Sequence, residues 1–125
     1  MEITLEIAQG ALLILHFVGL AALFGGFLVQ LRPIVAGEGK IFPAMIHGAW
    51  TMLITGLLIV AVAQWRIAEG AGFELDHVKI AVKSVVVTAV LFLVYIYRKR
   101  QAVKRGEMLS IGALTFANIV IAVLW

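Results

Sequence analysis

The residues of this chain best suited to chemistry are three histidines and two lysines within or beside long apolar stretches: His16, His47, His77, Lys79 and Lys83. Ionisable side chains are costly in such surroundings, so each of them is a candidate functional residue. The chain has no cysteine, which excludes a disulfide framework, a thiolate metal site and a thiol nucleophile. Imidazole is therefore the main candidate ligand for a metal.

A neutral imidazole in an apolar helix bundle most naturally serves as a metal ligand. Haem suits a bundle better than a bare ion, because the core can enclose the macrocycle and the axial ligand is commonly histidine. A zinc site would need three or four converging ligands. We expect His16 to ligate the iron of haem b, with neighbouring lysines pairing with the propionates. The opposite ligand is then His77, His47 or Lys83, and an open position is the alternative.

The elements that must position these residues follow from composition. Hydrophobic residues make up 63% of the 125 residues, charged residues 14%, and the mean hydropathy is +1.09. A soluble domain is nearer half apolar and a quarter charged. Four apolar blocks, at about 7–29, 43–64, 75–97 and 109–125, each have the length that a membrane-spanning helix needs. We predict an all-α integral membrane protein, a single four-helix antiparallel transmembrane bundle over residues 1–125.

The charges predict the orientation of the bundle. The net charge is +3 and the pI is about 9.6. Seven of the ten lysines and arginines fall in the two connections at 30–42 and 98–108, whereas the opposite ends carry mostly glutamate. The positive-inside rule then puts both termini outside and these connections in the cytoplasm of a multi-pass protein of the inner (cytoplasmic) membrane. Topology thus explains the basic pI, and no nucleic-acid partner is expected.

Helical periodicity indicates which polar side chains share a face. On the first helix, His16 lies on one face with Gly19 and other small residues that permit close packing. On the second, His47, Thr51 and Thr55 follow one another at four-residue spacing and form a polar stripe.

On the third helix, Asp76, Lys79 and Lys83 share a face, whereas His77 points elsewhere. Counting about 1.5 Å per residue predicts a cluster in the outer half of the bilayer. Its members are His16, His77, Lys79, Lys83 and Asn118. His47 lies apart from them, on the inner side.

Structural roles compete with functional ones at each position. His47 is equally explained by a hydrogen bond to a neighbouring carbonyl or threonine, and Asn118 is typical of side chains that bond across helices. Lys79 can extend to the outer headgroups. Lys83 and His16 lie deeper, where such explanations serve less well, so a functional role is favoured for both.

Two short motifs resemble those of a known family. The segment Ile14-Leu15-His16-Phe17-Val18-Gly19, continued by Phe24-Gly25-Gly26-Phe27-Leu28 and Leu31-Arg32, is similar to the first helix of HemJ-type protoporphyrinogen oxidases and CopD-like membrane domains. Asp76-His77-Val78-Lys79-Ile80 resembles the His-x-Lys opening of the third helix in the HemJ family. The chain has no Asn-Glu pair entering its last helix, so it resembles a divergent member.

The resemblance implies that His16 is a haem ligand and that His77 and Lys79 belong to the functional site. The leading hypothesis is a b-type cytochrome-like, haem-binding membrane protein that serves porphyrin oxidation, electron transfer or haem handling. The enzymatic version is a HemJ-like protoporphyrinogen oxidoreductase that passes electrons to quinone or another membrane redox partner. The alternatives are a metal or solute transport subunit and a structural subunit of a larger complex. Small-residue steps also permit a homo-oligomer.

Overall fold

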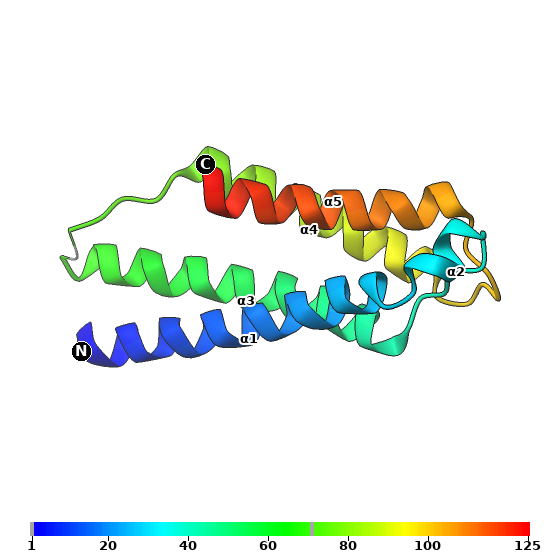
Figure 1. The fold of residues 1–125 in the computed structure, drawn as a ribbon. Coiled ribbons are helices and arrows are strands. Elements are labelled where there is room, and N and C mark those ends of the chain that lie inside the picture. The colour runs from blue at the N-terminus through cyan, green and yellow to red at the C-terminus, as the bar shows by residue number, and fades with distance from the viewer. Residues whose placement is uncertain (1, 71) are drawn as a thin grey trace.

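The computed structural model describes residues 2–70 and 72–125 and consists of helices joined by short connections. The long helices are α1 (Glu2–Leu28), α3 (Pro43–Ala68), α4 (His77–Tyr97) and α5 (Arg105–Leu124), and α2 (Leu31–Val35) is a single short turn of helix. All four long helices are long and apolar enough to cross a membrane. Consecutive long helices run in opposite directions, so the start of α1 and the end of α5 lie at the same end (Figure 1). The predicted four-helix antiparallel membrane bundle is confirmed.

The helix bounds differ from the apolar blocks mainly where polar residues continue a helix beyond the hydrocarbon. We expected helices at about 7–29 and 109–125, but α1 starts at Glu2 and α5 at Arg105. Hydropathy marks the lipid-facing length, whereas backbone hydrogen bonding continues through charged turns in water. The short α2 was not predicted. Pro43 occupies the first turn of α3, and Asp76 caps α4.

α1 packs chiefly against α3, and the two helices cross where Gly19 meets Gly48. A Cβ atom on Gly48 would lie 2.5 Å from the Gly19 carbonyl oxygen and 2.8 Å from the Leu23 amide nitrogen. Both neighbours are backbone atoms, so this approach requires glycine. The small-residue face predicted on the first helix therefore serves helix packing.

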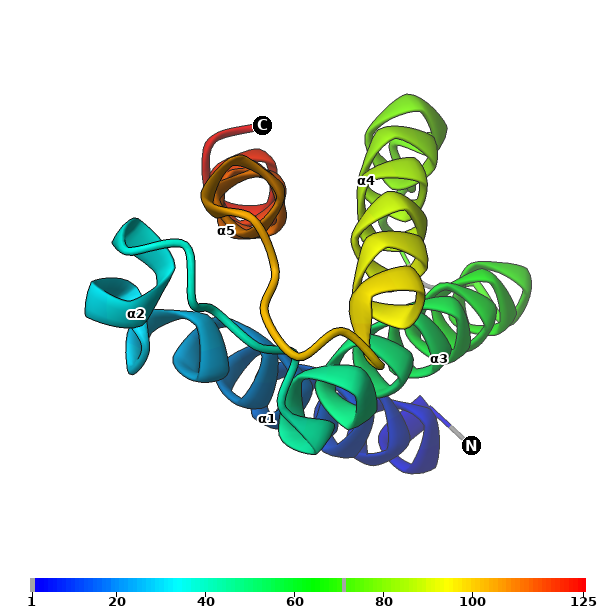
Figure 2. The ribbon, with the colours of Figure 1, turned by 90° about the vertical axis from the view of Figure 1, so that its right-hand side faces the viewer.

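The second pair, α4 and α5, lies against the first, with α4 on α3 and α5 on the end of α1 (Figure 2). The Phe27 ring lies over Gly112, where a Cβ would clash with it, and the Phe24 and Phe116 rings stack at 6.4 Å. Fully buried residues concentrate near this end of the bundle: Ile34, Met45, Val94, Val103, Met108 and Ile111. We call it the basic end, since it includes the two basic connections.

Connections also close the basic end. Gly39 and Val103 form an isolated antiparallel bridge, with the Val103 amide donating to the Gly39 carbonyl at 2.7 Å. The buried amide of Gln30 donates to the Lys40 carbonyl at 2.7 Å and accepts from the Lys40 amide at 2.9 Å. The two connections are thus fixed to each other and to the end of α1.

The opposite end is more open, and α1 and α3 extend beyond α4 and α5 there (Figure 1). The outer surfaces of the helices are apolar, with Val18, Val85 and Leu124 exposed by 59%, 68% and 79%. In a membrane protein this surface contacts lipid tails rather than water. The fold is that of a multi-pass membrane protein whose interior is packed at one end only.

Candidate functional site

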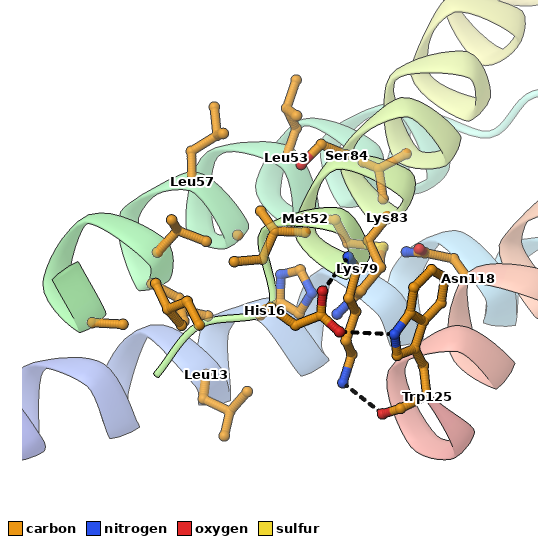
Figure 3. Close-up of a pocket in the computed structure, with 18 of the residues that line it drawn as sticks. Leu13, His16, Met52, Leu53, Leu57, Lys79, Lys83, Ser84, Asn118 and Trp125 are labelled. Atoms are coloured by element: carbon orange, nitrogen blue, oxygen red, sulfur yellow. Dashed lines mark hydrogen bonds between the residues drawn. The ribbon is translucent and has the colours of Figure 1, made fainter. Parts of the chain in front are cut away.

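A cavity of about 500 Å³ lies between the helix pairs at the open end. All four long helices and the connection before α4 contribute to its walls (Figure 3). Most of the wall is apolar, and the polar lining residues include Gln9, His16, Glu74, Asp76, Lys79, Lys83, Ser84, Asn118 and Trp125. Its size falls within the range of about 300–1,000 Å³ of small-molecule and cofactor sites.

His16 is held in a defined tautomer by Thr55 of α3. Its Nδ1 lies 2.9 Å from the Thr55 Oγ1. The single hydroxyl proton of Thr55 is donated to the Thr51 carbonyl oxygen, so Oγ1 accepts from the imidazole. This arrangement favours the tautomer with the ring proton on Nδ1, which leaves the Nε2 lone pair for a ligand.

Gly56 makes room for this ring. A Cβ atom at position 56 would lie 3.4 Å from the His16 Cε1, so the α3 backbone passes directly beside the imidazole. Thr55 and Gly56 thus fix the ring by a hydrogen bond and by contact. A histidine fixed at one nitrogen by a hydrogen bond is the usual arrangement of a metal ligand.

Two ammonium groups belong to the α4 wall of the cavity. Lys79 Nζ donates to the Trp125 carbonyl oxygen at 3.2 Å, whereas Lys83 lies one turn deeper and is half-buried. The ion pairs found in the described part of the chain, Arg66 with Glu6 and Arg100 with Glu107, include neither lysine. Glu74 and Asp76 also line the cavity, so its lining carries charges of both signs.

Asn118 of α5 is the polar group of the cavity that most needs a partner. The residue is only 3% exposed, and its Oδ1 has no hydrogen-bond partner among the described residues. A buried, unpaired carbonyl costs about 1–3 kcal/mol. This carbonyl oxygen, unpaired within the described part of the chain, is therefore available to a ligand.

A latch joins α4 and α5 at the mouth of the cavity. The Trp125 indole Nε1 donates to the Asp76 Oδ2 at 2.8 Å, and the other carboxylate oxygen accepts from the Lys79 backbone amide at 3.0 Å. The amide hydrogen bond at the helix start is the main cause that holds the pKa of the Asp76 carboxyl below its usual value, and the indole adds to it. Both carboxylate oxygens of Asp76 thus take part in the latch.

The remaining predicted residues lie elsewhere. His77 begins α4 with an exposed side chain, and His47 is exposed near the start of α3; neither lines the cavity. Within residues 2–70 and 72–125, no three histidine or acidic side chains converge in a way that could hold a metal ion. Of the expected outer cluster, the cavity brings together His16, Lys79, Lys83 and Asn118.

Sequence reasoning missed the partners of these residues. Thr55 was assigned to a polar stripe with His47, but its hydroxyl contacts His16 instead. The indole of Trp125, which forms the latch with Asp76, was likewise not assigned to the site. Gln9 lines the cavity, and its amide accepts from Arg66 at 2.7 Å. No signal in the chain could have assigned these partners, because each depends on how separate helices lie side by side.

Comparisons of the chain with protein-family models, with curated proteins and with solved structures find no match. The class of protein that fold and site define is a four-helix, multi-pass membrane protein with a cavity between its helix pairs, which is mostly apolar and carries several polar side chains.

Proposed function

We propose that this protein binds haem b in the cavity, with the Nε2 atom of His16 as an axial ligand. The observation that carries the proposal is the hydrogen bond from His16 Nδ1 to Thr55, because it presents the other nitrogen in the ligating tautomer beside a largely apolar cavity. Haem, when bound, supplies a redox-active iron. The first-helix resemblance to HemJ-type and CopD-like proteins agrees with the same residue.

The donor set fits haem better than a bare metal ion. One oriented imidazole suffices for an axial position, whereas a structural zinc site needs four ligands. Lys79, on the wall formed by α4, would pair with a propionate. Since His77 and His47 lie outside the cavity, Lys83 is the second candidate ligand, and an open position is the alternative.

The shape of the cavity favours a bound cofactor over a transport path. Toward the basic end, the space between the helices is filled by fully buried side chains such as Met45, Val94 and Met108. The cavity thus ends inside the bundle. Electron transfer, haem handling and porphyrin oxidation with a quinone acceptor are the roles compatible with such a site in the cytoplasmic membrane.

The experiment is a haem titration of the detergent-purified protein, followed by the Soret absorption band. The wild-type protein is expected to develop a histidine-ligated spectrum, and His16→Ala to lose it. His47→Ala is the matched control, because it removes an exposed imidazole and should bind like wild type.

Two results contradict the proposal. One is a colourless protein that stays colourless after haem addition. The other is an equal Soret response from the His16→Ala and His47→Ala variants, which would assign the response to haem partitioning into the micelle. Circular dichroism of each variant checks that the helices remain folded.

A further inference from the structure

A second site lies at the basic end, away from the cavity. A surface hollow there is lined by residues of α2 and of both basic connections: Pro33, Glu38, Lys40, Lys99, Arg100 and Gln101. Three of these residues are cations and one is an acid, and Arg100 is paired with Glu107 at 2.7 Å. Lys40 and Lys99 are exposed and form no ion pair within the described part of the chain.

The backbone around this hollow is fixed in place. Gln30, a buried amide, bonds both the carbonyl and the amide of Lys40. The Gly39–Val103 bridge ties the connection before α3 to the connection that bears Lys99. The two lysines are thus presented from backbone held at a set separation, unlike cations on a free chain, so an anion between them meets little ordering cost.

The hollow lies at the boundary between hydrocarbon and water. α1 ends at Leu28, α3 begins at Pro43 and α4 ends at Tyr97, so the connections between them lie at the depth of the headgroups. Tyr95 and Tyr97 sit under Arg98 and Arg100, with the guanidinium carbons 3.6 and 4.6 Å from the ring centroids. Aromatic rings topped by cations are typical of this interface.

Apolar side chains stand exposed beside the hollow. α2 buries Ile34 completely, but Leu31 and Val35 are 42% and 58% exposed, and the neighbouring Val29 is 76% exposed. α2 thus buries Ile34 against the bundle and exposes Leu31 and Val35, and its Pro33 lines the hollow. An occupant that satisfies both surfaces has an anionic headgroup and acyl chains.

We propose that this hollow binds the phosphate of an anionic phospholipid, with Lys40 and Lys99 on the headgroup and the α2 side chains against the acyl chains. The site is independent of the haem proposal, since it shares no residue with the cavity. Each lysine at the membrane surface contributes about fivefold to the affinity for an anionic lipid, so the pair contributes about 25-fold.

The test measures binding of phosphatidylglycerol to the full chain in phosphatidylcholine nanodiscs, by the lipid that native mass spectrometry finds retained. The Lys40→Gln/Lys99→Gln variant is expected to weaken retention about 25-fold. Lys104→Gln/Arg105→Gln is the matched control, because it removes the same charge from exposed positions of the same end outside the hollow. This control should retain the lipid nearly as the wild type does.

Three results would overturn the site. Equal losses in the two double variants would mean general attraction by the basic end. Equal retention of phosphatidylcholine and phosphatidylglycerol would remove the role of the headgroup charge. Displacement of the lipid by inorganic phosphate at matched ionic strength would mean that the acyl chains contribute nothing. The altered side chains are all exposed, so a folding defect is not expected, and circular dichroism verifies this.

Discussion

Replacing Thr55 with valine tests how His16 is held. The two residues are nearly the same size, so the change removes the hydroxyl that accepts from Nδ1 at 2.9 Å and leaves the wall of the cavity in place. An interhelical hydrogen bond within a membrane contributes about 0.6–2 kcal/mol, which is the expected loss of stability of the haem-free protein. Without this partner the imidazole can rotate and can take either tautomer.

The larger effect is expected on haem. Loss of the partner that orients a ligating histidine lowers metal affinity by about 10–100-fold. This corresponds to about 1.4–2.7 kcal/mol of binding free energy. The assay is a haem titration of each variant in nanodiscs, with the dissociation constant taken from the Soret band. Nitrogen NMR of the haem-free wild type should show His16 protonated at Nδ1.

Thr115→Val is the matched control for this experiment. Like Thr55, Thr115 is buried, and its hydroxyl donates to the carbonyl four residues earlier, but it has no contact with a histidine. The control should bind haem like the wild type. Equal dissociation constants for the Thr55 and Thr115 variants would refute the positioning role of Thr55. A wild-type imidazole protonated at Nε2 would refute the tautomer argument directly.

Three further predictions concern the cavity, the helix crossing and the latch. Asn118→Leu removes the unpaired carbonyl, so it should raise the free energy of unfolding of the ligand-free protein by about 1–3 kcal/mol and weaken ligand binding. A variant less stable than the wild type would contradict the interpretation that this carbonyl is unpaired. Gly48→Ala should lower the free energy of unfolding by about 1–3 kcal/mol, because the added Cβ would meet the backbone of α1. Gly10→Ala is the control, since a Cβ there has nothing within 4 Å, and it should be neutral or stabilising in the same denaturant titration. Because the folded pKa of Asp76 is lowered, the latch should be complete above the ordinary carboxyl pKa and lost only as the pH falls through the lower folded value. The NMR resonance of the Trp125 indole proton should shift with this transition, and the shift should be absent in Asp76→Asn. A midpoint at or above the ordinary carboxyl pKa would contradict the prediction.

The site was predictable in part because helical periodicity and hydropathy act along one element at a time. The shared face of Lys79 and Lys83 was predicted from their spacing, and both residues line the cavity. The same spacing turned His77 away from that face, and its side chain lies outside the cavity. Grouping His77 with the cluster by depth failed, because depth along the membrane normal says nothing about direction around a helix.

The amino-acid sequence alone determined the class of protein and the positions of its helices. Apolar blocks of spanning length leave helices as the structure that pairs every backbone group in lipid, and the basic connections distinguish one end from the other. Tertiary structure decided which side chains meet. α1 and α3 are in close contact where they cross at Gly19 and Gly48. This crossing brings Thr55, rather than His47, to the imidazole of His16. Contacts between helices depend on such crossings, and a crossing is a property of two surfaces in contact, so no pattern along one chain segment specifies it.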